Sequence, residues 1–212
     1  MEKLTHDELL SEWKSAREYK SFTNDGILIE DKWKQSSPKI LFLLKESNAG
    51  FDNIAGRGWG PNGNSNTFWR RINICSYIIT EIWNDRKPSF HEVATVKERE
   101  VNSIAYVNVK KNGENKSTSN NNEILQYARN DKDYLARQIS IINPDVIYCG
   151  GTINSYKHLF PCEEIGENLY SSEGRLIIAF YHPSYSKSFE KIYEGLLTIL
   201  QNFKISDLKN NP

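Results

Sequence analysis

The sequence predicts an α/β fold in three layers, α/β/α, with a central, mainly parallel sheet of four strands. Apolar runs that suit buried strands recur at 40–44, 103–109, 145–151 and 175–180. Segments with helical spacing separate these runs, and such alternation is typical of a parallel sheet with helices on both faces. The share of hydrophobic residues, 38%, and of charged residues, 25%, agrees with a globular domain.

The helical segments can be placed in order. The opening "MEKLTHDELLSEWKSA" is amphipathic, and "TFWRRINICSYIITEIW" has apolar residues at helical spacing after Asn66, a candidate N-cap. One helical period covers 123–143 until Pro144 ends it, "TINSYKHLF" is a short helix, and a closing helix covers about 188–203. "GILIEDKW" is a candidate short strand. The segment 51–66, with four glycines and four asparagines, is a long loop of the kind that usually serves function.

Length and charge limit the organisation of the chain. At 212 residues we expect a single domain over 1–212, with a helical extension over 1–25 and a motif-bearing core over about 39–203. Lys and Arg number 27, as do Asp and Glu, so no overall positive field attracts nucleic acid. This balance counts mildly against DNA binding but leaves room for a local basic site.

The cysteines and the hydropathy of the chain indicate whether to expect metal sites, disulfides or membrane spans. Cys75, Cys149 and Cys162 are widely spaced and form no CxxC pair, so we expect buried free thiols and neither a zinc site nor disulfides. No apolar run approaches the ~18 residues of a membrane span, and the N-terminal segment lacks a signal-peptide core. We expect a cytoplasmic monomer with no metal, no cofactor and no membrane partner.

Polar side chains gather where three predicted strands end. The segments are "KESNAG", "YVNVKK" and "YHPSYS", and the carboxyl ends of parallel strands share one crevice. Uncharged amides, one histidine, one carboxylate and an aromatic ring suit a neutral planar ring better than a phosphate. The candidates are Glu46, Ser47, Asn48, Asn108, Lys110, His182 and Ser184, with Trp59 from the glycine-rich loop.

In their order along the chain, these segments resemble motifs of the uracil-DNA glycosylase superfamily, most closely its mismatch-specific thymine/uracil branch. "ESNAG" stands where that branch has Gly-x-Asn-Pro-Gly, so Asn48 and Gly50 match, and "NTFWRR" is similar to an asparagine followed by "FW". "YVNVKK" matches a strand that ends in a uracil-reading asparagine. "QISIINPDVIYCGG" resembles a helix, a proline and a strand ending in glycine, and "HPS" matches the second motif. Glu46 and Ala49 depart from the first motif and could reshape its water-holding turn.

The resemblance implies the glycosylase fold and roles in excising a base from DNA. Asn108 would pair with uracil O4 and N3–H, and Trp59, or less favourably Phe68, would stack on the ring. His182 would stabilise the negative charge that develops on uracil O2.

Further roles follow from the same resemblance. Asn48 or Glu46 would position or activate the attacking water, and both stay open as candidates. Additional base contacts would come from Ser47 and Gly50. Contacts to the DNA backbone would come from Ser184, Ser186, Lys187 and Lys110. The iron–sulfur branch of the superfamily needs four cysteine ligands, which three scattered cysteines cannot provide, so no cluster is expected.

Three functions are open from the sequence. The first is a glycosylase whose partner is DNA with a damaged or mismatched base. The second is a catalytically impaired module that binds a nucleobase or nucleic acid, which the altered first motif favours. The third is a structural or interaction protein, in which the His-Pro-Ser segment is an ordinary turn, Asn108 satisfies backbone groups and Phe68 packs in the core. The third predicts an occluded crevice, with His182 and Asn108 facing other protein groups.

Overall fold

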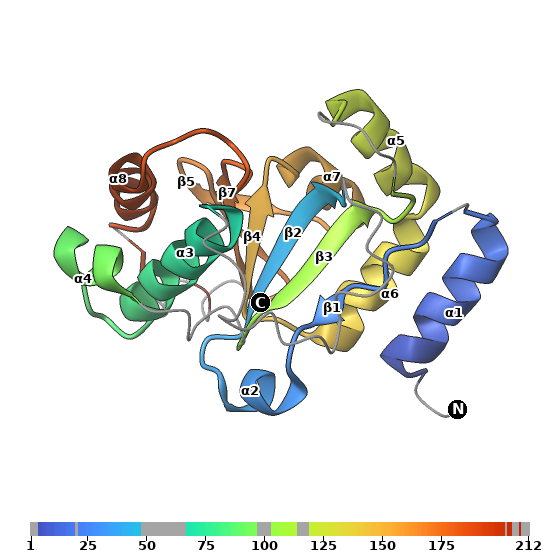
Figure 1. Ribbon diagram of the computed structural model, residues 1–212, viewed down its shortest axis with the longest axis horizontal. Helices are drawn as coiled ribbons and strands as arrows, with labels where there is room; N and C mark the ends of the chain where they lie inside the picture. The colour runs from blue at the N-terminus through green and yellow to red at the C-terminus, as the bar shows by residue number, and fades with distance from the viewer. Residues whose placement is uncertain are drawn as a thin grey trace.

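One mixed sheet organises the protein, with its strands in the order β1-β3-β2-β4-β7-β6-β5 (Figure 1). The structure is a computed structural model, and it describes residues 4–19, 21–47, 67–96, 103–113, 119–201, 203, 204 and 208. Four adjacent strands run parallel: β3 (Ala105–Lys110), β2 (Ile40–Glu46), β4 (Val146–Gly150) and β7 (Arg175–Phe180). The expected α/β class is therefore confirmed, although the sheet as a whole is mixed and only its four central strands are parallel.

The sheet is larger than the four strands that the sequence predicts. The short strand β1 (Gly26–Ile27) pairs antiparallel with β3, β6 (Leu169–Ser172) pairs antiparallel with β7, and β5 (Glu163–Gly166) pairs antiparallel with β6. The side chains of β5 are exposed or half-buried at the edge of the sheet, so this strand needs no apolar run. A search for apolar runs finds central strands and misses such edges.

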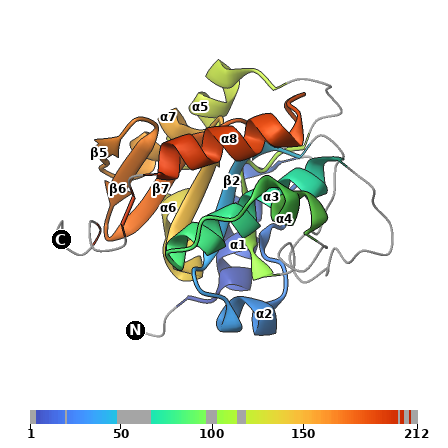
Figure 2. The ribbon, with the colours of Figure 1, turned by 90° about the vertical axis from the view of Figure 1, so that its left-hand side faces the viewer.

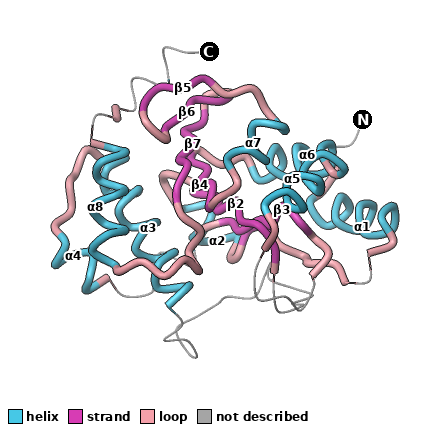
Figure 3. Tube along the Cα trace, turned by 90° about the horizontal axis from the view of Figure 1, so that it is seen from above, coloured by secondary structure: helices cyan, strands magenta, loops and turns pink. Residues whose placement is uncertain are grey.

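Helices cover both faces of the sheet (Figure 3). One layer holds α3 (Thr67–Trp83), α4 (Phe90–Thr95) and α8 (Phe189–Leu200); the other holds α1 (His6–Arg17), α5 (Asn121–Asn130), α6 (Lys132–Ile142) and α7 (Ile153–Leu159). Along β2, Phe42 and Leu44 pack toward the α3/α8 layer, while Leu41 and Leu43 pack toward the α1/α6 layer. Burial on both faces explains the continuous apolar run.

Two local predictions need correction. Only the first two residues of "GILIEDKW" form a strand, and α2 (Glu30–Gln35) follows them. The helix predicted over 123–143 is two helices that meet at Asp131. The Asp131 carboxylate accepts hydrogen bonds from Arg17 Nε and from the Tyr19 hydroxyl, both at 2.6 Å. These partners lie far away in the sequence, so the local periodicity does not reveal the break.

Candidate active site at the carboxyl ends of the parallel strands

The parallel strands carry polar residues to one edge of the sheet. In the strand register, Glu46 of β2 lies opposite Lys110 of β3, and Gly150 of β4 lies opposite Phe180 of β7. His182 follows β7 by two residues, and its Cα lies 3.5 Å from the position that a Cβ on Gly150 would occupy. Residues from the three segments that the sequence singles out therefore meet at this edge.

The backbone of the turn at His182 is held by two buried side chains from other elements. Tyr148 on β4 donates its hydroxyl to the Tyr181 carbonyl at 2.6 Å. Arg71 on α3 donates Nη1 to the Pro183 carbonyl at 2.9 Å and Nη2 to the Lys187 carbonyl at 3.0 Å. A guanidinium that bridges two carbonyls four residues apart fixes the course of the turn, because its donors are planar and rigid.

The imidazole of His182 is a neutral hydrogen-bond donor near pH 7. Burial, and secondarily the positive charge of Lys45, lowers the His182 pKa to about 4. Its Nδ1 lies 3.1 Å from the backbone nitrogen of Ser184 and accepts that N–H. In a neutral ring whose Nδ1 accepts, the proton is on Nε2. The turn therefore presents an Nε2–H group.

An aromatic wall stands beside this imidazole. The Phe68 ring centroid lies 6.1 Å from that of His182, with 37° between the planes. Phe68 also meets the edges of Trp69 and Tyr106, at centroid distances of 5.1 and 6.3 Å. The half-buried Phe68 thus packs against the core, as the structural interpretation expects, and also adjoins His182, as the stacking interpretation requires.

Glu46 belongs to a buried cluster with Lys110. Lys110 Nζ lies 3.1 Å from Glu46 Oε2, in an ion pair without hydrogen-bond alignment, and 2.6 Å from Glu123 Oε1 on α5. The Lys110 side chain has no exposed surface. We expected Lys110 to contact a DNA phosphate, but its ammonium group is enclosed by this cluster, so such a contact would require the cluster to open. Among the described residues, the ion-pair partner of Glu46 is Lys110.

Asn108 is fully buried, and its donors face Asp25. Its backbone nitrogen and Nδ2 donate to Asp25 Oδ2 at 2.7 and 3.1 Å. Its Oδ1 is buried and makes no hydrogen bond of good geometry with the described residues, although the Tyr106 hydroxyl lies nearby. The Asn108 side chain thus faces other protein groups, as the structural interpretation expects, and its Oδ1 could meet a base only if the surrounding side chains opened.

The remaining predicted residues divide into two groups. Asn48, Gly50 and Trp59 lie outside the described residues, so their roles stay predictions. The others lie near the His182 turn or the end of β2: Ser47 is buried, Ser184 and Ser186 are exposed, and Lys187 is half-buried.

Several residues that shape the site carry no signal in the sequence. Arg71 and Tyr148 look like ordinary members of a helix and a strand, and Asp25 precedes a strand of two residues. Their roles come from contacts with the backbone of the turn and with Asn108. A charged residue within an otherwise apolar helical segment is the sequence signal that could have drawn attention to Arg71, because such groups are normally paired when buried.

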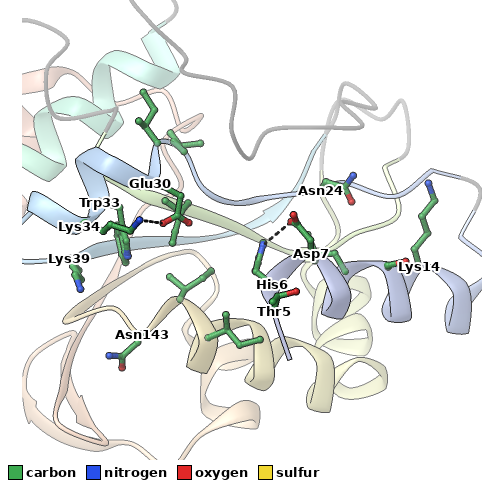
Figure 4. Close-up of a pocket in the computed structure, with 17 residues that line it drawn as sticks. Thr5, His6, Asp7, Lys14, Asn24, Glu30, Trp33, Lys34, Lys39 and Asn143 are labelled. Atoms are coloured by element: carbon green, nitrogen blue, oxygen red, sulfur yellow. Dashed lines mark ion pairs between the residues drawn. The ribbon is translucent and has the colours of Figure 1, made fainter. Parts of the chain in front are cut away.

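A cavity of about 1190 Å³ lies at the opposite end of the sheet (Figure 4). Its walls include Lys39 and Asn143, which precede β2 and β4, together with the start of α1 and residues of α2. Lys34 and Glu30 form an ion pair of 4.0 Å in this wall. None of the predicted site residues in the described part of the chain belongs to its lining.

Comparisons with known proteins add no family assignment. No protein-family model matches the chain, and no curated protein matches it. Within the described ranges, no helix has the length and apolar character needed to cross a membrane.

Proposed function

We propose that the chain is a uracil-DNA-glycosylase-like hydrolase that removes uracil, or a related damaged or mismatched base, from DNA. The observation that carries the proposal is the neutral His182 ring, whose Nε2–H is presented by a braced turn at the carboxyl ends of the strands. A neutral, fixed donor stabilises negative charge in a transition state without first reorganising. The glycosylase fold implied by the motifs is part of the same proposal.

In this reaction the bond between C1′ and the base nitrogen breaks, and its electron pair moves onto the base. His182 Nε2–H would donate to uracil O2, where the charge accumulates. A water oxygen forms the new bond to C1′, and the proton that the water loses reaches the departing base or solvent. The Glu46 carboxylate, held at the end of β2 by Lys110, would orient that water, and Asn48 is the alternative for this task.

A second candidate is a catalytically impaired module that binds a nucleobase or nucleic acid through the same residues. Two contacts favour it. The Glu46 carboxylate already has Lys110 as a partner, and the Asn108 donors already have Asp25. In this case Asn108 Oδ1 and His182 would recognise a ring without hydrolysing its bond.

A glycosylase assay with matched variants separates the two candidates. The substrates are single-stranded and duplex oligonucleotides that carry uracil opposite G or A, hypoxanthine, or mismatched thymine. His182→Gln should lower the rate by about 100-fold or more, as loss of one transition-state donor does. His158→Gln, at an exposed position on α7, is the control and should leave the rate unchanged. Glu46→Gln and Asn48→Ala identify the residue that positions water.

The outcomes differ clearly. Base release that persists in His182→Gln, Glu46→Gln and Asn48→Ala would point to a contaminating enzyme and contradict the proposal. No release on any substrate, combined with uracil-dependent binding that His182→Gln weakens, would favour the binding module.

The pH profile supplies an independent check. Because the His182 pKa is lowered to about 4, the ring stays neutral in the range where an ordinary histidine gains a proton. The contribution of His182 to the rate should therefore stay constant from about pH 8 to about pH 5. The ratio of the wild-type rate to the His182→Gln rate measures it. A ratio that falls near pH 6.5 would show that the donor is not this neutral ring.

A further inference from the structure

Two exposed tyrosines flank the His182 turn. Tyr181 and Tyr185 are 49% and 59% exposed, and their rings stack with centroids 5.8 Å apart and planes 12° from parallel. Lys187 Nζ lies 5.0 Å from the Tyr181 centroid and 5.7 Å from that of Tyr185. Paired aromatic rings in solvent, with a cation over both, are typical of a binding surface and differ from scattered exposed apolar residues.

The backbone that carries these rings is held in place. Tyr148 and Arg71 bond to the carbonyls of Tyr181 and Lys187, and the Lys187 N–H donates to the Tyr185 carbonyl at 2.8 Å. Fixed ring-bearing residues lose little conformational entropy when a ligand stacks on them.

A groove of about 540 Å³ begins at Tyr181 and Lys187 and continues along α8, which lies beside β7 (Figure 2). Its α8 wall includes Lys191 and Gly195. A Cβ at Gly195 would come within 2.8 Å of the Phe180 ring, so glycine allows α8 to approach β7 closely at the base of the groove. Two lysines and one carboxylate, Glu167, line it, which leaves positive charge in excess.

We infer that Tyr181, Tyr185, Lys187 and the adjoining groove, together called the tyrosine groove, bind the single-stranded DNA segment that flanks the base at His182. Unpaired bases stack on exposed aromatic rings, while lysines along the same path neutralise phosphates. A duplex offers these rings little, because its bases already stack on one another. The link to His182 rests on the proposed function, whereas strand binding itself needs no catalysis.

Fluorescence anisotropy with a labelled oligothymidylate tests the inference, since this probe contains no base to excise. We expect the protein to bind it more tightly than a duplex of equal length. Tyr181→Ala and Tyr185→Ala should each weaken binding by about tenfold, the effect of losing one stacked base. Lys187→Met should reduce the slope of log affinity against log salt by about 0.7, the value for one phosphate of a single strand.

The chain offers a matched control on another surface. Lys157 Nζ lies 4.1 Å from the centroid of the Tyr170 ring, in a cation–π pair outside the groove lining. Tyr170→Ala and Lys157→Met should leave both the affinity and the salt slope unchanged. Urea unfolding of every variant identifies any loss of binding that comes from loss of folding.

The results distinguish this inference from the proposed function. Equal affinity for duplex, wild-type affinity in both groove tyrosine variants, or equal losses in Tyr170→Ala would overturn the tyrosine groove, even with excision intact. Single-strand binding that needs both groove tyrosines, with no excision of any base, would uphold the groove and contradict the glycosylase.

Discussion

Lys110 and Lys111 are adjacent and both lack exposed side-chain surface, yet their surroundings shift their pKa values in opposite directions. Neither side chain has exposed surface. Burial lowers the pKa of both ammonium groups, but the contacts of Lys110 with Glu123 and Glu46 raise its pKa overall. For Lys111 burial outweighs the attraction of Asp25, and its pKa is lowered.

One difference lies in how carboxylates are shared. Lys110 has the carboxylates of Glu46 and Glu123 around it. Among the described residues, Lys111 forms its close ion pair with Asp25, and Asp25 also accepts from Asn108 and, at 3.1 Å, from Gln138 Nε2. The Asp25 cluster thus joins β3 and α6 to the segment before β1, whereas the Lys110 cluster joins β2, β3 and α5 at the candidate site. The two lysines teach that the pKa of a lysine without exposed surface depends both on how deeply the protein encloses it, more so for Lys111, and on how many donors share its anion.

The largest expected effect comes from Asp25→Asn. This variant keeps the shape but deprives the buried Lys111 cation of its ion-pair partner, which should lower the free energy of unfolding by about 3–5 kcal/mol. Urea unfolding followed by circular dichroism measures the change. Asp7→Asn, whose side chain is fully exposed, is the control and should leave the free energy of unfolding nearly unchanged.

A double variant sharpens this result. Asp25→Asn combined with Lys111→Met removes both charges, so it should be more stable than Asp25→Asn alone. Equal stabilities would mean that the uncompensated charge is not the source of the loss.

Lys110→Met should lower the free energy of unfolding less, by about 2 kcal/mol, because Glu46 and Glu123 differ in exposure. Glu46 has a side chain only 1% exposed and loses its partner, while Glu123 is 31% exposed and can be hydrated. Lys132→Met, at an exposed position of α6, is the control for the substitution. A loss equal to that of Asp25→Asn would show that carboxylate sharing does not decide the cost.

Much of the framework for these clusters is visible in the sequence. Apolar runs predict the central strands, and the common edge of parallel strands explains why Glu46 and His182 lie at one end of the sheet. The pairings at that edge are not predictable in this way. Asn108 and Asp25 are 83 positions apart, and Arg71 and Pro183 are 112 apart. Local periodicity carries no information about contacts that form only when distant elements pack.

Alkaline pH provides the next test, with an expected slope below about 1.4 kcal/mol per pH unit for each group. The folded-state pKa of Lys111 is lowered, so between that value and its ordinary 10.5 the unfolded chain binds more protons and stability rises with pH. The pKa of Lys110 is raised, so its contribution is full below 10.5 and is lost only as pH rises further.

The measurement is the stability difference between wild type and each lysine variant, from about pH 8 to about pH 10.5. The difference should grow with pH for Lys111→Met and stay level for Lys110→Met. Parallel trends in the two variants would contradict the opposite shifts.

The smallest effect is expected from Glu123→Gln. Because Glu123 is partly exposed, this variant should lower the free energy of unfolding by less than about 1 kcal/mol. Glu173→Gln, which breaks the exposed ion pair of 2.7 Å with Arg175, is the control of similar size.

The more informative measurement on Glu123→Gln is how its free energy of unfolding depends on pH. With Glu123 neutral, Lys110 loses one of the carboxylates that raise its pKa, so stability should fall less steeply above pH 10.5. If Glu123→Gln leaves that alkaline fall unchanged, the Glu123 carboxylate is not what raises the pKa of Lys110.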